Sequence, residues 1–193
     1  MEQLFFKFDQ IKLLSPALRA HIQSILIRKV VKKGDIILEK GQTAKFIYFI
    51  EEGVVRNVRV VEGKEKTGWI MKKDDLFLSV RSFFSQTAAM ERIEALKDCI
   101  LHCISFEQLE KTYDDYPEFD RHGRILLQYY YQLSEERNEM RDQAAYNRFV
   151  YLMTHQPELV GEVLDYVLAS YLSMEPETFS AQKGKFAQGN KNK

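Results

Sequence analysis

The sequence predicts an α+β fold in which a roll of short β-strands is followed by a long helix and then by two short helices around a tight turn. Three observations predict this order. Short apolar runs bounded by turn residues recur at roughly 8–12-residue spacing as far as Ile104. The apolar period becomes helical after Ser105. A further helix starts at Pro176, after a polar break.

The segment before Ser105 carries most of the predicted strands. Ser15-Pro16 opens a short helix, because proline suits the first helical position, and Leu18 and Ile22 follow at helical spacing. Residues 46–50 are apolar on both faces and predict a buried strand. The other predicted strands are residues 36–38, 54–61, 67–71, 92–96 and 99–104. Their number and spacing predict a small barrel or sandwich.

The segment after Ser105 is predicted to be helical. Ser105 is the expected cap of a helix over residues 106–113, and a long helix starts at Pro117 and continues to about residue 142. A further helix could begin between Asp142 and Tyr146. The long helix has an apolar seam in a 3-4 rhythm, which needs a partner surface, and a second copy of the helix is the simplest one. The predicted dimer contacts are Phe119, Leu126, Tyr129, Leu133 and Met140.

The last part of the chain predicts two short helices, one near residues 162–172 and one from Pro176. After Lys183 the sequence becomes rich in Gly, Gln, Asn and Lys, which predicts a frayed tail.

Composition excludes several classes of protein. The 28 basic and 28 acidic residues give a net charge of zero, which argues against a strongly basic nucleic-acid coat. The 45% hydrophobic content predicts a packed core rather than disorder. No apolar run approaches the roughly 18 residues of a membrane span. The N-terminal residues lack a signal-peptide layout, and two cysteines cannot form a disulfide framework, so we expect a cytoplasmic protein.

Residue patterns for enzyme chemistry are also missing. Cys99 and Cys103 share one face of a predicted strand and are expected as free core cysteines. The four histidines are scattered, so no metal site is expected, and no cofactor either. No phosphate-binding loop or nucleophile triad occurs, so the protein is not expected to be an enzyme.

The order of roll, seam helix and helix-turn-helix resembles the catabolite-activator (Crp/Fnr) family, the cyclic-nucleotide-sensing bacterial transcription regulators. The resemblance rests on residues 33–41 and 46–56, on 93–96 with 101–105, and on 169–180. It covers nearly the whole chain. It implies a β-roll sensor domain (a double-stranded β-helix or jelly roll) over residues 1–115. It further implies a dimerisation helix over 116–143, a helix-turn-helix domain over 144–193, and a homodimer.

The ligand site departs from the pattern of the family it resembles. Members carry a Gly-Glu pair for the ribose and an arginine ten residues after the glutamate for the cyclic phosphate. Here Leu78-Ser79 and Ala89 stand at those places. Arg81 or Arg92 could supply a cation from another angle, although both are expected at the surface or rim. Cyclic AMP is therefore not the expected effector, and a different small molecule, or none, is expected instead.

The resemblance still implies a pocket. Its expected lining is Trp69, Phe77, Ser79, Arg81, Ser82 and Thr87, with Tyr130 and Ser134 contributed by the long helix. The single tryptophan, Trp69, could equally be a core residue, since that is the commoner role of tryptophan on a short strand.

The C-terminal motif resembles the DNA-reading element of the family. Ala169 is the small residue of the first helix, and Ser173 stands four residues later, where the family usually has glycine. The implied recognition helix covers residues 175–186 and offers Glu177, Thr178, Ser180 and Lys183 to double-stranded DNA.

Two features of this motif weaken the case for DNA binding. Ala181 replaces the arginine that the family directs at guanine. Residues 154–180 include five acids and no lysine or arginine, and phosphate neutralisation needs cations. Two hypotheses therefore stay open: a ligand-responsive transcription regulator, and a sensor or protein-interaction module with a vestigial helix-turn-helix.

Overall fold

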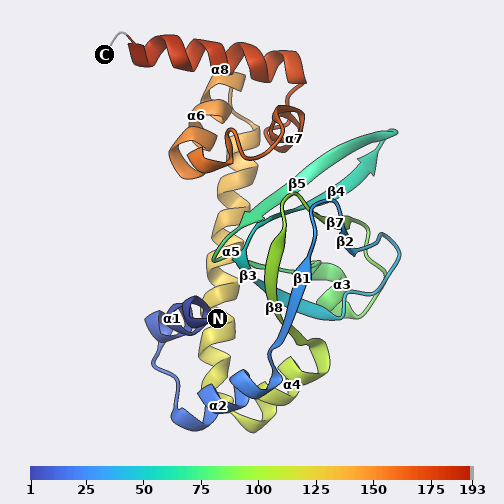
Figure 1. Ribbon diagram of the computed structural model, residues 1–193, viewed down its shortest axis with the longest axis vertical. Coiled ribbons are helices and arrows are strands. Elements are labelled where there is room, and N and C mark those ends of the chain that lie inside the picture. The colour runs from blue at the N-terminus through green and yellow to red at the C-terminus, as the bar shows by residue number, and fades with distance from the viewer. Residues whose placement is uncertain (192–193) are drawn as a thin grey trace. The chain divides into compact units, whose positions relative to one another are not determined.

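A computed structural model describes residues 1–191, which form two compact units (Figure 1). The first unit comprises Met1–Arg59 and Trp69–Tyr129. The second comprises Val60–Gly68 and the chain from Tyr130 onward. The predicted domain boundaries at residues 115/116 and 143/144 stay predictions, and the two units are described separately below.

Two four-stranded antiparallel sheets make up the roll, with strand orders β1-β8-β3-β6 and β2-β7-β4-β5. The strands are β1 (Ile27–Val31), β2 (Ile36–Leu38), β3 (Phe46–Glu52), β4 (Val54–Val61), β5 (Lys64–Lys72), β6 (Leu76–Phe77), β7 (Arg92–Ala95) and β8 (Cys99–Ser105). All six predicted strands are confirmed. The strands β1 and β6 were not predicted, because β1 mixes charged and apolar residues and is mostly exposed, while β6 has only two residues.

The strand-glycine-strand signature has a steric cause. Tyr48, Phe49 and Ile50 of β3 are buried, as the apolar run predicts. Gly53 follows with φ 105°, and a Cβ there would lie 2.5 Å from the Cys99 Sγ and 2.6 Å from the Asp98 carbonyl oxygen. Only glycine fits this turn, because both the dihedral angle and the space exclude a side chain.

Helices cover the first unit. They are α1 (Glu2–Ile11), α2 (Pro16–Ile25), α3 (Val80–Ser85), α4 (Phe106–Asp115) and the 3-10 turn η1 (Pro117–Phe119). The predicted Ser105 cap is confirmed, since its hydroxyl accepts from the Gln108 N–H, and Pro16 is the first residue of α2 as predicted. The Ser15 hydroxyl also caps α2 by accepting from the Leu18 N–H. Helix α1 was not predicted. It buries Leu4, Phe5 and Phe8 in the core.

The second unit contains helices and the tip of the β4–β5 hairpin. Helix α5 (Asp120–Arg141) enters it from the first unit. It is followed by α6 (Ala145–His155), the 3-10 turn η2 (Pro157–Leu159), α7 (Asp165–Tyr171) and α8 (Pro176–Lys191). The new helix expected between Asp142 and Tyr146 is confirmed as α6. The first short helix of the motif is shorter than predicted.

The predicted frayed tail is wrong for residues 184–191, because α8 continues to Lys191, and the last two residues of the predicted tail lie outside the described residues. Tertiary packing explains the difference. The Phe179 and Phe186 rings lie 5.3 and 5.6 Å from the Phe149 ring of α6, so α8 is anchored beyond Lys183. Intrinsic helix propensity of a Gly- and Asn-containing segment does not include such contacts.

The tip of the β4–β5 hairpin packs on α7 inside the second unit. The Thr67 N–H donates to the Ser170 hydroxyl oxygen at 2.9 Å. The buried Arg137 side chain of α5 donates to the Tyr171 carbonyl oxygen at 2.8 Å and the Thr67 carbonyl oxygen at 3.4 Å. Its guanidinium also lies 3.9 Å from the centre of the Tyr171 ring. Burial lowers the pKa of Arg137 to about 10.

Three further findings concern the described residues as a group. None of their helices is long and apolar enough to cross a membrane. Cys99 and Cys103 are free and buried, as predicted, and burial raises the pKa of both thiols. No cluster of three or more His, Cys, Asp or Glu side chains is placed to hold a metal ion within residues 1–191.

Candidate functional site

The predicted ligand residues of the roll fall into two groups. Phe77, Ser79 and Ser82 are buried, whereas Arg81 and Thr87 are exposed. Trp69 is partly buried and packs against the core, which agrees with its interpretation as a core residue. The structure therefore separates an interior set of predicted positions from a solvent-facing set.

The buried serines already have partners in the fold. The Ser79 hydroxyl donates to the Glu91 carboxylate at 2.8 Å. The Ser82 hydroxyl accepts from the Ala44 N–H at 2.8 Å and donates to the Thr87 carbonyl oxygen at 2.5 Å. These bonds fix α3 against the neighbouring loops, so the serines support the roll in the structure as it stands.

A set of buried charges was missed from the sequence. Glu91 is only 7% exposed, and its carboxylate lies 3.6 Å from the Arg59 guanidinium. The buried Arg56 pairs with Glu94 at 2.6 Å across β4 and β7, and Arg92 pairs with the same carboxylate at 2.8 Å. In the sequence, the only indication of this set was an arginine within a valine-rich strand and acids close to Ile93. The sequence does not show that these charges are neighbours, because the pairing of β4 with β7 brings them together.

The roll therefore presents a different charge pattern from a cyclic-phosphate site. Ala89, at the position of the expected arginine, is buried and uncharged. The hydroxyl of Ser79, at the position of the family's glutamate, holds the carboxylate of Glu91.

Tyr130 and Ser134 belong to the second unit, and both are half-buried. Their predicted contribution to the pocket stays a prediction.

The predicted dimer seam requires a correction. Phe119 is 3% exposed and packs against Phe8 and Tyr113, with ring centres 5.4 and 5.5 Å apart, and Met140 is 1% exposed. Neither side chain is available to a second subunit. Apolar residues in a 3-4 rhythm can face either the core of the same chain or a second subunit. Only the tertiary packing shows which of the two a given residue faces.

Other apolar residues of α5 remain exposed. Leu127 is 61% exposed and Tyr131 is 65% exposed, and the two lie four residues apart on one helix face. Of the predicted contacts, Tyr129 is exposed, while Leu126 and Leu133 are partly buried. The exposed stripe therefore lies one to two residues away from the predicted seam.

The two C-terminal helices are joined by a left-handed turn. Ser173 has φ 55°, the conformation that normally selects glycine. Its N–H donates to the Ser170 carbonyl oxygen, and the Met174 N–H donates to the Ala169 carbonyl oxygen, which is the Schellman pattern. Arg148 caps the same end by donating to the carbonyl oxygens of Leu172 and Ser173 at 2.9 and 2.8 Å. Ala169 is fully buried, as a small residue at that place should be.

Helix α8 has one buried and one exposed face. Phe179 is buried and Phe186 half-buried, as predicted. The exposed set is Glu177, Ser180, Ala181 and Gly184, and it is flanked by the half-buried Thr178 and Lys183. The Lys183 amine is 2.9–3.0 Å from both oxygens of the Asp165 carboxylate of α7. This lysine is therefore neutralised within its own unit.

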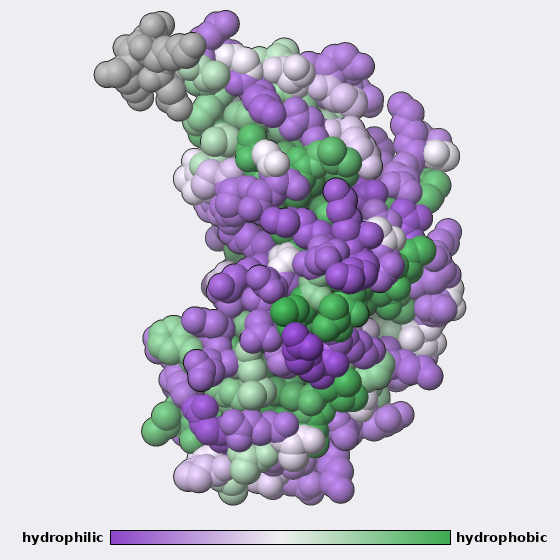
Figure 2. Space-filling view, in the orientation of Figure 1, coloured by the Kyte–Doolittle hydropathy of each residue, from purple (hydrophilic) through white to green (hydrophobic). Residues whose placement is uncertain are grey.

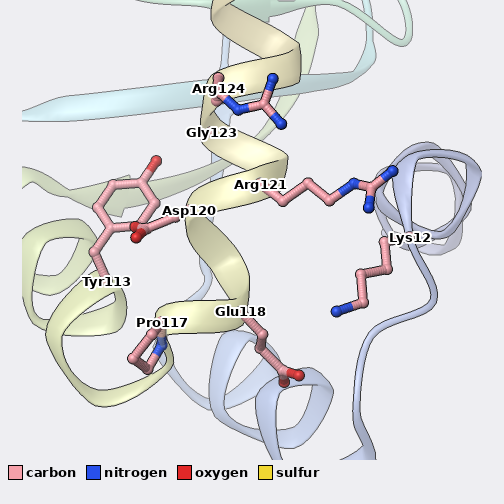
Figure 3. Close-up of a pocket in the computed structure, with 8 residues that line it drawn as sticks. All are labelled: Lys12, Tyr113, Pro117, Glu118, Asp120, Arg121, Gly123 and Arg124. Carbon is pink, nitrogen blue, oxygen red and sulfur yellow. The ribbon is translucent and has the colours of Figure 1, made fainter.

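Two surface cavities in the first unit involve none of the predicted ligand residues. One, of about 510 Å³, lies around the start of α5 and is lined by Lys12, Tyr113, Pro117, Glu118, Asp120, Arg121, Gly123 and Arg124. Figure 3 shows Arg121 extending from α5 toward the segment that carries Lys12, while Tyr113 and Asp120 lie on the other side of the helix. The other cavity, of about 370 Å³, opens between β1 and β2.

Residues 28–116 match the family model described as the cyclic nucleotide-binding domain. This segment is therefore similar to cyclic nucleotide-binding domains. No curated protein matches the sequence. Over most of its length the chain is similar in fold to solved structures of Crp/Fnr regulators. FixK2 from Bradyrhizobium japonicum is 17% identical with a TM-score of 0.74, and the match covers 86% of each chain.

Two other solved structures show the same similarity in fold to this chain. A transcriptional regulator of the Crp/Fnr family from Eubacterium rectale is 20% identical with a TM-score of 0.68, covering 91% of this chain and 85% of that one. The c-di-GMP-responsive regulator CLP from Xanthomonas campestris is 14% identical with a TM-score of 0.64, covering 91% and 93%. The predicted fold class, with its β-roll, long helix and helix-turn-helix, is confirmed.

Proposed function

We propose that the protein is a ligand-responsive transcription regulator of the Crp/Fnr type that acts in the cytoplasm. The observation that carries the proposal is the left-handed Schellman turn at Ser173, which joins two helices C-terminal to a cyclic nucleotide-binding domain. Glu177, Thr178, Ser180 and Lys183 lie on or beside the solvent-facing side of α8, and in this proposal they contact double-stranded DNA as a recognition helix does.

The effector in this proposal is a small molecule other than cyclic AMP. Ala89 provides no cation for a cyclic phosphate, and Ser79 is already bonded to the buried Glu91. An effector acts by binding one arrangement of the protein more tightly than another, so its chemistry must suit the side chains that the roll provides.

The proposed active form is a homodimer paired along α5. The exposed Leu127 and Tyr131 support it, because a symmetric contact between two copies would remove both side chains from water. At about 25 cal/mol per Å² of buried apolar surface, such contacts favour association.

The test is a fluorescence-anisotropy titration of the full chain against DNA from upstream of its own gene, at several salt concentrations. We expect weak binding with a shallow salt slope, corresponding to roughly two to four phosphate contacts per dimer at about 0.9 each. A scrambled duplex of equal length is the control. Tight binding that persists at high salt would contradict the weak-contact argument.

The second candidate function is a sensor or interaction module that no longer binds DNA. The ion pair between Lys183 and Asp165 favours it, because it removes one of the few cations beside the exposed face of α8. An absence of binding to any duplex at low salt would establish this alternative over the regulator.

A further inference from the structure

The lining of the cavity between β1 and β2 includes two polar side chains that can bind an anion, Lys29 and Tyr48. Lys29 lies on β1, and its amine is 3.9 Å from the centre of the Phe46 ring and 5.6 Å from that of Tyr48. It forms no ion pair with any described residue. A cation that lies over aromatic rings at the edge of a cavity remains available to an anion.

Tyr48 provides the second polar group of this cavity. Its side chain is only 8% exposed, and its ring stacks on Phe77 with centres 4.8 Å apart. Within residues 1–191 its hydroxyl has no hydrogen-bond partner. Burial raises the pKa of Tyr48, so the hydroxyl keeps its proton and can donate. The hydroxyl is not among the buried polar atoms that lack a partner, so it reaches solvent and is free to donate to a bound acceptor.

The remaining wall is apolar and open to solvent. Val31, Ile36, Ile37 and Leu101 line it, and Ile36 is half exposed. Figure 2 shows hydrophobic residues reaching the surface in the region of β1 and β8. The volume of about 370 Å³ lies within the range of small-molecule sites. The lining of the cavity therefore combines apolar side chains with one cation and one hydroxyl donor.

Asp35 is the one acid in the lining, and it limits the charge of a ligand. It lies in the turn before β2, where its carboxylate accepts from the Lys32 N–H at 2.9 Å. With one lysine and one aspartate beside the cavity, a ligand with two negative charges would be repelled. A single carboxylate is the anion that one lysine and one hydroxyl can satisfy.

We propose that this cavity is a binding site for a small monocarboxylate with an apolar body. The carboxylate accepts from the Lys29 amine and the Tyr48 hydroxyl, and the apolar body packs on Val31, Ile37 and Leu101. None of these residues belongs to the predicted nucleotide pocket. The inference concerns the isolated protein and holds whether or not the protein binds DNA.

The test uses 4-fluorophenylacetate as the probe and its fluorine NMR signal as the measurement on the full chain. We expect line broadening that saturates with protein. Lys29→Met keeps the aliphatic stem and removes the charge, and it should weaken binding roughly tenfold or more. Tyr48→Phe removes only the hydroxyl and should weaken binding roughly threefold to tenfold.

Three controls keep the result specific. Lys33→Met removes an exposed lysine outside the cavity and should leave binding unchanged. The neutral probe 2-(4-fluorophenyl)ethanol should bind far more weakly. Circular dichroism should show that both cavity variants are folded, since neither polar group has a hydrogen-bond or ion-pair partner among the described residues. Equal binding of the neutral probe, or no broadening with folded wild-type protein at millimolar concentration, would overturn the proposal.

Discussion

Ser173 holds the backbone of the helix-turn-helix in a conformation that a side chain disfavours. The left-handed conformation costs a non-glycine residue roughly 1–2 kcal/mol of free energy. The Schellman hydrogen bonds at this turn require Ser173 to adopt that conformation. Serine at the place of the family's glycine therefore stores strain between α7 and α8. This strain has consequences for stability that a single substitution can expose.

Ser173→Gly should stabilise the protein by about 0.5–1 kcal/mol, because relief of the strain exceeds the entropy that glycine adds to the unfolded chain. The measurement is the midpoint of chemical unfolding. The matched control is Ser180→Gly, the same change on the exposed face of α8, which should destabilise by up to about 1 kcal/mol. If both variants lose stability, the turn is not strained.

The carboxyl of Asp75, just before β6, should make the stability of the fold depend on pH. Burial raises the pKa of this carboxyl above its usual value of 3.8. A carboxyl with a raised pKa destabilises the fold once it is charged, so the cost is absent well below pH 3.8 and present at neutral pH. Asp75→Asn keeps an oxygen for the Lys72 N–H. We expect a higher unfolding temperature than wild type at pH 7 and an equal one at pH 3. An advantage that persists at pH 3 would contradict this explanation.

Cyclic AMP should give no calorimetric signal at micromolar concentration. The physical reason is the uncharged, buried Ala89 together with the carboxylate of Glu91, which leave a cyclic phosphate without a paired cation at a cost of several kcal/mol. A micromolar signal that disappears in Arg81→Ala or Arg92→Ala would show that one of these arginines supplies the cation after all.

At the scale of elements, α5 combines a buried and an exposed apolar face. Phe119, directly before it, and Met140, near its end, stabilise single units, whereas Leu127 and Tyr131 contact solvent. An exposed apolar pair at i and i+4 is the pattern of a helix that pairs with another surface. The candidate dimer contact is therefore this stripe, with Tyr129 beside it.

The double variant Leu127→Glu with Tyr131→Glu should be monomeric, because two copies would bring like charges together across the contact. Light scattering at high protein concentration measures the mass. Gln132→Glu is the control, since Gln132 is exposed on another side of α5 and its variant should remain dimeric. A monomeric wild-type protein would refute the contact itself.

At the scale of the whole molecule, the distribution of charge limits the affinity for DNA that we propose for the C-terminal motif. The chain has no net charge, and residues 154–180 carry five acids and no lysine or arginine, whereas contacts to DNA phosphates need cations. The pairing of Lys183 with Asp165 lowers the cationic character further. Salt dependence is thus the most informative property of any complex with DNA.

Asp165→Asn should strengthen DNA binding severalfold, because it releases Lys183 and removes one acid from each subunit. The slope of log affinity against log salt should steepen by roughly 0.9 for each new phosphate contact. Glu162→Gln removes an acid without releasing this lysine and should change affinity without changing the slope. An unchanged slope for Asp165→Asn would show that Lys183 does not reach a phosphate.

Much of the fold was predictable because it depends on local chemistry. Turn residues indicated where the strands end. Ser15, followed by proline, and Ser105 indicated where their helices begin. The spacing from Ala169 to Ser173 indicated the position of the left-handed turn. Phe179 and Phe186 indicated the buried face of α8 because residues seven apart share one side of a helix. These features need only a few neighbouring residues.

The tertiary structure alone decided the rest. The sequence by itself determined that a nucleotide-type arginine is missing at Ala89. Only the tertiary structure brought Ser79 to Glu91, and only strand pairing brought Arg56 to Glu94. Packing removed Phe119 and Met140 from the dimer seam and extended α8 beyond Lys183. The cavity at Lys29 and Tyr48 combines residues of β1, β2, β3 and β8. The physical reason is the same in each case: these neighbours are distant in sequence, and side-chain burial depends on them rather than on local periodicity.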